Sequence, residues 1–380
     1  MNIGSYHQRQ KDRQIYAIDN YKLEAVQRTT ERIRIRHEND NYTIYQLIAE
    51  VRKIDEKIRN CYEDSANEYS EEALSWMFTM DACFILEFFR TSVAEPPKEE
   101  DNTKVAEEEE HAKEQERFSL LFEYNGRQNI FRYEIMRDII KLENQIPLFV
   151  LRKILELHHK NEDDAVSEFV ELLLHLQEFT GFPFSLSSSD DKMKKETIDP
   201  KIRSSLQKHI KEASHLLDFS RRVIKDILTD STSPRTATDN LKSPSSNSSD
   251  GESTPSARKL HEAGIIFKPG TAGEVKFEGR HFRSSTFCIP EITIDDDTEI
   301  FLRNLIALEE CQGSRMSPEP TIISNYIHLM DDLIDTSEDV GVLKKGKVIK
   351  SLVGSDEEIA TTINDLCKGI TDNPYPHTRK

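Results

Sequence analysis

Three aspartates at residues 331–335 have the spacing of a magnesium site. They are Asp331, Asp332 and Asp335, in the order DDxxD. On one continuous helix, Asp331 and Asp335 would share a face, where their carboxylates could hold Mg²⁺ over a diphosphate group. However, Asp335 is followed by residues 336–338, Thr-Ser-Glu, which are typical of the start of a helix. Two interpretations therefore stay open, a metal–diphosphate site and a helix-capping role.

A second acidic stretch, residues 163–171, places Asp, Ser and Glu at a spacing similar to the second metal motif of terpene synthases. In those enzymes the DDxxD motif comes first, whereas in this chain it comes second. Ala165 also stands where a branched residue is usual. The order of the motifs argues against this chemistry, which we keep as an alternative.

Two glutamate–histidine pairs have the ExxH spacing of a di-iron ligand motif. They are Glu156 with His159, and Glu212 with His215. Di-iron enzymes built on four-helix bundles use two such motifs together with two further glutamates. The sequence shows no clearly placed partner glutamates, and His215 adjoins two leucines on an expected core face. A metal-dependent enzyme that uses these pairs, or the three aspartates, is the alternative function.

Residues 341–348 satisfy the pattern GxxxxGK, but Val348 stands where a P-loop needs a hydroxyl to bind Mg²⁺. A short helix, rather than a strand, is expected before the second glycine. We predict instead that Gly346 ends this helix in the left-handed conformation, beside lysines that suit a helix C-terminus. The chain also lacks HExxH, GxSxG, GxGxxG and a kinase catalytic loop. We expect no catalytic, cofactor-binding or metal-binding residue.

Charge indicates an acidic protein without a nucleic-acid surface. The 380 residues carry 51 Lys+Arg and 69 Asp+Glu, a net charge of −18. The densest basic patch, residues 28–36, has only four arginines, and nucleic-acid binding needs a face that neutralises several phosphates together. The patch is interpreted as a solvated helix face or a contact for an acidic partner.

The cysteines indicate a reducing environment, and the apolar runs are too short to span a membrane. The five cysteines form no CxxC, and no export signal is recognisable at the start, so a disulfide framework is not expected. No apolar stretch reaches the roughly 20 residues of a membrane-spanning helix. We expect the chain as given to be cytoplasmic.

Helical periodicity dominates the remaining pattern. Apolar residues recur at spacings of three and four in several segments, and such stripes must pack on one another. Two of these stripes are Ile44, Leu47, Ile48, Val51 and Ile58, and Trp76, Met80, Cys83/Phe84 and Phe88. Residues 265–294 are instead β-prone and punctuated by Gly and Pro. Residues 355–358 form a capping box that opens a last helix. We predict a mainly α fold, a multi-helix globular assembly with a small β element near 265–294 and disordered linkers.

Two segments are too polar to fold alone, the acidic 95–116 and the Ser/Thr/Pro-rich 230–257. They divide the chain into parts that we expect to form one family domain. The expected parts are a helical part at 1–94, a central helical part at 117–229, an α+β part at 258–371 and a tail at 372–380.

Residues 142–151 read Leu-Glu-Asn-Gln-Ile-Pro-Leu-Phe-Val-Leu, a sequence that predicts a joint between two helices. Pro147 disfavours helical geometry at Ile146 and suits the first turn of the next helix. Asn144 and Gln145 can satisfy loose backbone groups at the break. This central part of the chain therefore turns at a defined point.

With this joint, several ordered segments resemble the plant family called domain of unknown function 247. They are residues 2–7 (similar to the family's SIGPYH opening), 80–87, 215–218, 260–268, 289–296, 303–309 and 330–334. The resemblance implies a plant protein of unassigned activity, without an established catalytic residue or cofactor. Relatives typically carry a single membrane-spanning helix near the C-terminus, which this chain is expected to lack, and some grass members are associated with self-incompatibility recognition.

From these observations we expect a non-enzymatic interaction or scaffold protein with a protein partner. We expect no nucleic-acid partner, and membrane attachment only through the anchor that relatives carry. Candidate contact elements are the basic face at 28–36, the acidic run at 95–116 and the linker at 230–257.

Overall fold

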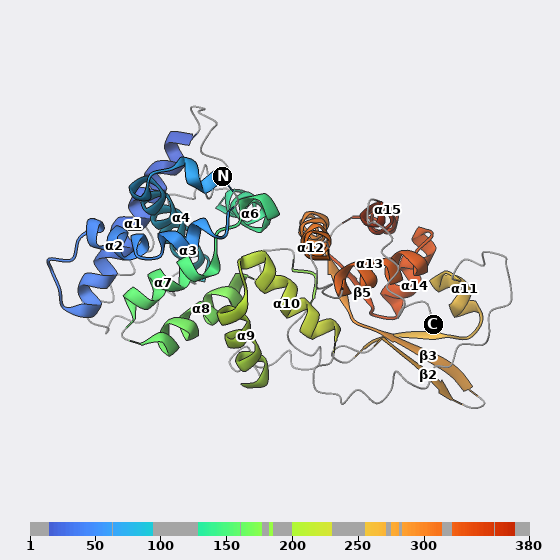
Figure 1. Ribbon diagram of the computed structural model, residues 1–380. Helices are drawn as coiled ribbons and strands as arrows, with labels where there is room; N and C mark the ends of the chain where they lie inside the picture. The colour runs from blue at the N-terminus through green and yellow to red at the C-terminus, as the bar shows by residue number, and fades with distance from the viewer. Residues whose placement is uncertain are drawn as a thin grey trace. The chain divides into compact units, whose positions relative to one another are not determined.

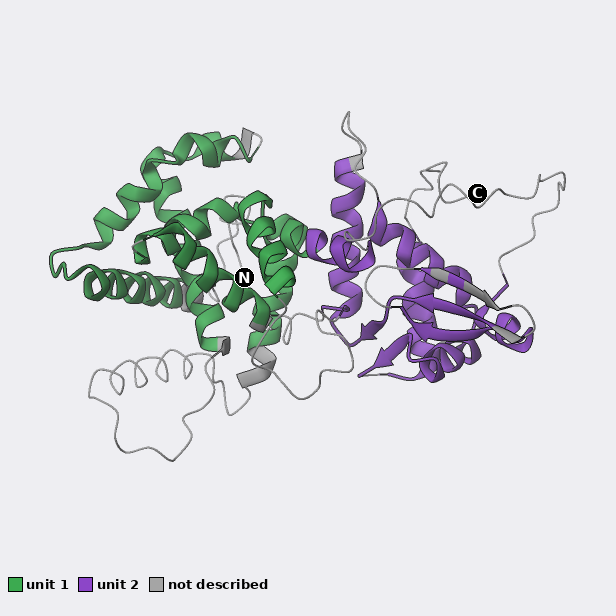
Figure 2. Cartoon of the chain, turned by 90° about the horizontal axis from the view of Figure 1, so that it is seen from below, with its two compact units in different colours: residues 1–180, 198–220 green, residues 181–197, 221–380 purple. Residues whose placement is uncertain are grey.

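The computed structural model describes residues 15–62, 64–93, 128–159, 161–176, 182–184, 200–229, 255–270, 275–280, 283–313, 321–352 and 354–368. The fold is mainly α, as predicted (Figure 1). The chain divides into two compact units (Figure 2): unit 1 is Met1–Thr180 with Ile198–Ser220, and unit 2 is Gly181–Thr197 with Arg221–Lys380. The segments 95–116 and 230–254 and the tail 372–380 lie outside the described residues. The domain borders expected there stay predictions.

Unit 1 is built from helices that surround one long central helix. Its elements are α1 (Ile15–His37), α2 (Ile44–Arg52), α3 (Asp55–Arg59), η1 (Asp64–Glu68), α4 (Glu71–Val93), α6 (Gln128–Ile140), η2 (Leu142–Asn144), α7 (Leu148–His158), α8 (Glu162–Leu176), α9 (Pro200–Glu212) and the start of α10 (Leu216–Leu228).

Helix α4 forms the core of unit 1, because α1, α2, α7 and α8 all pack against it. The helix is buried on nearly every side from Leu74 to Thr91. Its rings Phe78, Phe84 and Phe88 are at most 1% exposed, and each contributes about 1.5–3 kcal/mol of burial. A helix that is buried on every side lies in the protein interior, where its charged residues, Glu87 and Arg90 among them, need partners. The single stripe expected from the sequence therefore understated how deeply α4 is buried.

The joint between α6 and α7 has the hydrogen bonds that the sequence predicted. The Asn144 amide donates to the Asp138 carbonyl at 2.7 Å. The Gln145 amide donates to the Ile139 and Lys141 carbonyls at 2.7 and 2.8 Å. These carbonyls lie at the C-terminal end of α6, where helical partners run out. Asn144 and Gln145 therefore end one helix before Pro147, at the N-cap position, starts the next.

Gln145 also reaches a third helix, since its side-chain oxygen accepts a hydrogen bond from the Leu217 N–H at 3.1 Å. We expect Gln145→Ala to lower the free energy of unfolding by about 1–2 kcal/mol, because three backbone groups lose a partner but stay partly accessible to water. Urea unfolding followed by the fluorescence of Trp76, the only tryptophan, measures this. Glu143→Ala, an exposed change in the same joint, is the control; equal losses for both variants would contradict the prediction.

Unit 2 combines helices with two small sheets. Its elements are α11 (Ala257–Glu262), β1 (Ile266–Pro269), β2 (Lys276–Arg280), β3 (Arg283–Ile289), β4 (Ile292–Ile294), α12 (Thr298–Gly313), α13 (Ile322–Leu333), α14 (Ser337–Lys345), β5 (Ile349–Ser351) and α15 (Asp356–Cys367).

The predicted β element near 265–294 is present as β1 to β4. The first sheet has the order β1-β3-β2, with β1 parallel and β2 antiparallel to β3. The second pairs β4 in parallel with β5, which the sequence analysis did not predict. Three residues at 349–351 carry too little pattern to indicate a strand. The extended conformation of β5 goes with its pairing to β4, a contact distant in sequence.

Gly346 is not left-handed, and this prediction was wrong. Its φ is −73°, in the right-handed region, and the next residue, Lys347, has the positive φ of 59°. A Cβ at Gly346 would lie 2.8 Å from the Cβ and 2.9 Å from the carbonyl oxygen of Phe267. The glycine is therefore needed because β1 packs against the end of α14. The capping box at Ser355 was predicted correctly, since Ser355 Oγ accepts from the Glu358 N–H at 3.2 Å.

Candidate functional site

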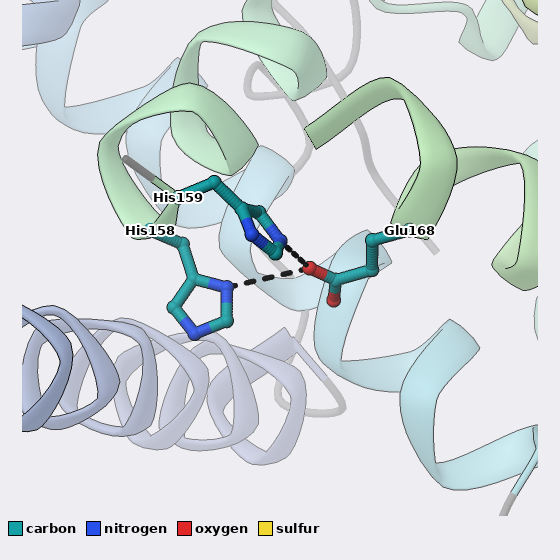
Figure 3. A group of neighbouring side chains, drawn as sticks. All are labelled: His158, His159 and Glu168. Atoms are coloured by element: carbon teal, nitrogen blue, oxygen red, sulfur yellow. Dashed lines mark hydrogen bonds and ion pairs between the residues drawn. The ribbon is translucent and has the colours of Figure 1, made fainter. Parts of the chain in front are cut away.

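Two histidines and one glutamate converge in unit 1 (Figure 3). His158 is the last residue of α7, His159 follows it, and Glu168 lies on α8. His158 Nδ1 is 3.3 Å from Glu168 Oε2, and His159 Nε2 hydrogen-bonds the same oxygen. The three side chains are 12–21% exposed. Because a short turn joins α7 to α8, the end of one helix lies beside the first turns of the next.

A chain of buried charges supports the glutamate from the other side. Arg90 on α4 places Nε and Nη2 at 2.8 and 2.6 Å from Glu168 Oε1. Its Nη1 donates to Glu87 Oε1 at 2.9 Å, and Arg32 of α1 pairs with the same oxygen. Glu87 is 1% exposed and Arg90 is 9% exposed. The two carboxylate oxygens of Glu168 therefore have different partners: Oε1 contacts Arg90, and Oε2 contacts the histidines.

The environment fixes the charges in this cluster. Burial alone would raise the pKa of Glu168, but hydrogen bonds from the two histidines and the Arg90 charge outweigh it and hold that pKa well below its usual range. Burial lowers the pKa of His158, only partly offset by its hydrogen bond to Glu168. At neutral pH the cluster thus holds an ionised carboxylate beside a neutral imidazole at His158. Such groups can bind a metal ion, or hold α7, α8 and α4 together.

Of the four ExxH residues, only His159 belongs to this cluster. Its predicted partner Glu156 is not among the converging side chains, and Glu168 takes that place. In the second pair, His215 accepts a hydrogen bond at Nδ1 from the Asp218 N–H at 3.2 Å, at the start of α10. The two ExxH motifs do not meet among the described residues. What places His158 and Glu168 together is the helical hairpin, which motif spacing does not reveal.

The DDxxD aspartates do not share a helix face. Helix α13 ends at Leu333, so Asp335 lies beyond it and donates its N–H to Asp339 Oδ2 at 3.2 Å. Asp339 completes a capping box with Thr336 at the start of α14. Asp331 lies in the last turn of α13, where burial raises its pKa. Within the described ranges these aspartates join no group of converging ligand atoms, and the cap of α14 comes from Thr336 and Asp339 rather than from the Asp335 carboxylate.

The second acidic stretch also has mainly structural roles. Asp164 donates its N–H to the Asn161 side chain at 2.8 Å, at the start of α8. Glu171 pairs with Arg203 of α9. Glu168 is the member that joins the histidine cluster.

The basic face at 28–36 is partly turned inward. Arg28 pairs with Glu24 at 3.0 Å, and its side chain is only 10% exposed. Arg32 reaches the buried Glu87 on α4. Arg34 pairs with Glu31 at 2.9 Å. Arg36 is exposed, so the patch keeps a solvated end, and its role as a contact for an acidic partner stays a prediction.

A polar depression of about 500 Å³ lies on unit 2. Ser337, Gly341 and Lys345 of α14 and Asp356 of α15 line it. The Lys344 ammonium and the Asp356 carboxylate are paired at 2.8 Å beside it. The converging histidines belong to unit 1, so the depression and the cluster are separate features.

A comparison with known protein families decides the family. The model of domain of unknown function 247, described as "Plant protein of unknown function", matches residues 1–379. The chain belongs to this family. The resemblance drawn from the joint at 142–151 and the other ordered segments is thus confirmed, and it spans both units.

Two Arabidopsis thaliana proteins are similar to this member of the family. The UPF0481 protein At3g02645 is 24% identical in an alignment 434 residues long. The alignment covers 97% of this chain and 74% of that protein. The UPF0481 protein At3g47200 is 24% identical over 380 residues, which cover 97% of this chain and 68% of that protein. No solved structure matches the chain. Within the described ranges, no helix combines the length and the apolar character needed to cross a bilayer.

Proposed function

We propose that this member of the family is a non-enzymatic interaction protein that binds an extended segment of a protein partner along β2. The observation that carries the proposal is Phe277, whose side chain is 57% exposed on a strand at the edge of a sheet. Large apolar side chains on an ordered edge strand are unfavourable unless another chain covers them.

Phe277 is the outer end of an aromatic row that crosses the sheet. Phe267 of β1 and Phe277 of β2 both pair in register with Phe287 of β3. The ring centroids are 5.9 Å apart for Phe267 and Phe287, and 6.2 Å apart for Phe277 and Phe287. Phe267 is 3% exposed and anchors the row in the core of unit 2. The row therefore continues from the core to the surface, where the Phe277 ring is held in place.

The backbone of β2 supplies the second half of the surface. Among the strands that the structure describes, β2 pairs with β3 alone. Every second N–H and C=O of an edge strand points away from the sheet and can pair with an added strand. Val275, 49% exposed, lies immediately before β2 and precedes Phe277 by two residues, so a second apolar side chain is accessible beside the edge. An extended peptide with alternating apolar residues matches this combination.

Other contact elements have less support. The arginines at 28, 32 and 34 already have carboxylate partners within unit 1, and the segments 95–116 and 230–254 lie outside the described residues. The net charge of −18 also favours a protein partner over a nucleic acid.

Selection from a randomised library of 10-residue peptides on the purified chain tests the proposal. Enriched peptides should alternate apolar and polar residues, and Phe277→Glu should weaken their binding at least about tenfold, because it removes the aromatic contact and places a charge on the edge. A proline at the centre of a peptide should abolish binding, because it removes a donor from the added strand.

Leu352→Glu is the matched control, since Leu352 is 71% exposed in unit 2 but lies outside this sheet. Equal binding to wild type and Phe277→Glu would overturn the proposal. A dimer that forms with rising concentration and is lost in Phe277→Glu would assign β2 to a second copy of the chain, and would also overturn it.

A further inference from the structure

We propose that His158, His159 and Glu168 bind one divalent transition-metal ion of the zinc or iron(II) type. Their ligand atoms all lie within 4.8 Å of one another. The 3.3 Å between His158 Nδ1 and Glu168 Oε2 is close to the separation of two ligands that each lie about 2.1 Å from one tetrahedral ion. The third ligand, His159 Nε2, hydrogen-bonds the same oxygen, so side-chain rotation is required to bring it to a ligand separation.

The donor set selects the class of metal. Two imidazole nitrogens with one carboxylate oxygen suit zinc, iron(II), cobalt(II) and nickel(II), whereas Mg²⁺ and Ca²⁺ prefer oxygen ligands throughout. Three protein ligands leave at least one coordination position open. On binding, each imidazole carries its proton on its other ring nitrogen, Nε2 of His158 and Nδ1 of His159, so that the two hydrogen bonds to Glu168 are replaced by three bonds to the ion.

The surrounding charges form the outer shell that a metal site requires. Arg90 binds Glu168 through Oε1 alone, at 2.8 and 2.6 Å, and leaves Oε2 directed at the histidines. Arg90 is itself fixed by Glu87 at 2.9 Å. Carboxylate ligands in metal sites are commonly held in this way, and the outer partners keep the ligand oriented. Glu87 is shared by Arg90 and Arg32 and offsets only part of their charge, so its main contribution is to hold the Arg90 guanidinium in place against the ligand.

A purely structural network is the competing explanation, since two histidines on a buried glutamate also hold α7 to α8. The two explanations differ in what the folded protein does with a metal. A metal site binds one equivalent and prefers zinc over magnesium, whereas a structural network binds neither.

Zn²⁺ binding to the full chain, measured by titration calorimetry and by equilibrium dialysis, tests the proposal. We expect one Zn²⁺ per chain with micromolar affinity or tighter, and no competition from excess Mg²⁺. Substitution with Co²⁺ should give visible d–d absorption without a thiolate charge-transfer band, because no cysteine is a ligand. A wild-type chain that binds no stoichiometric Zn²⁺ overturns the proposal, and this result requires no variant to fold.

Variants locate the ion. His159→Ala and Glu168→Gln should each weaken Zn²⁺ binding about 100-fold, whereas Glu156→Gln, which alters the glutamate of the ExxH motif outside the cluster, should leave it unchanged. Circular dichroism at the same temperature confirms that each variant is folded. Unchanged Zn²⁺ affinity in a folded His158→Ala/His159→Ala variant would place the ion elsewhere and would refute this site.

Discussion

Glu87→Ala is expected to lower the free energy of unfolding of unit 1 by about 3–4 kcal/mol. Glu87 is 1% exposed, and its Oε1 is shared by Arg90 at 2.9 Å and by Arg32. Removing one partner of a buried ion pair is costly because the remaining charge stays desolvated, with a typical loss of about 3–5 kcal/mol. Arg90 keeps its contact with Glu168, and Arg32 is 21% exposed, so the lower part of that range applies.

The fluorescence of Trp76 is the appropriate measurement, because this only tryptophan of the chain lies on α4 in unit 1. The urea midpoint should fall strongly for Glu87→Ala. For Glu134→Ala the free energy of unfolding should fall by at most about 0.5 kcal/mol. Glu134 is the matched control, since it pairs with Arg137 on the surface and is 60% exposed. Similar losses for the two variants would show that the shared carboxylate does not hold α1 to α4.

Glu309→Ala is expected to destabilise unit 2 by about 2–3 kcal/mol. Glu309 on α12 accepts hydrogen bonds from the Ile323 and Ser324 N–H groups at 3.1 and 2.9 Å, and from the Ser324 hydroxyl at 2.8 Å. These N–H groups open α13 and have no partner within the helix. Glu309 therefore caps α13 from a neighbouring helix, and its loss leaves buried donors unsatisfied at about 1–3 kcal/mol each.

The cost stays below the sum of these bonds because the carboxylate is itself desolvated. Burial raises the pKa of Glu309, although the Ser324 and Ile323 hydrogen bonds and the Arg221 charge act against it. Alanine removes this unfavourable contribution together with the hydrogen bonds. The net effect is a loss of stability, since nothing replaces Glu309 as the acceptor for the N–H groups at the start of α13.

Thermal unfolding followed by far-ultraviolet circular dichroism measures the effect of Glu309→Ala. Glu299→Ala on the same helix is the control, because Glu299 forms an exposed pair with Arg303 and its loss should cost less than about 1 kcal/mol. Comparison with the Trp76 signal also shows whether the two units unfold together. If Glu309→Ala melts at the wild-type temperature, the cross-helix cap contributes nothing to stability.

These two glutamates show that acids outside any recognisable catalytic motif have a structural role in this chain. Glu87 and Glu309 are both buried and both hold one helix to another. Neither belongs to an ExxH or DDxxD pattern. The acids that resembled motifs, such as Asp335, belong instead to local turns between helices.

Much of the fold was predictable because its signals are local. The stripe on α2 placed Leu47, Ile48 and Val51 in the core, where the structure has them. The joint at Gln145 and the capping box at Ser355 were also predicted, because the groups they satisfy lie within a few residues along the chain. The family followed from the order of such segments.

The candidate site was predictable only in part, through His159. Its partner Glu168 was noticed within a different motif, and His158 had no pattern of its own. Arg32 and Glu87, 55 residues apart, appeared in the sequence as members of a basic patch and of a segment that resembles the family. No spacing rule connects residues on different helices, because the contact depends on how the helices pack.

The sequence by itself determined the helical character of the chain, the joint at 142–151, the capping box at 355–358 and the family, since each rests on hydrogen bonds or apolar periodicity within one segment. Only the tertiary structure decided which charges are buried together, why Gly346 must lack a side chain against Phe267, and where β5 finds its partner. The physical reason is that these features depend on contacts between residues far apart in the sequence. In the interior, where such contacts form, an unpaired charge or a misplaced methyl group is costly.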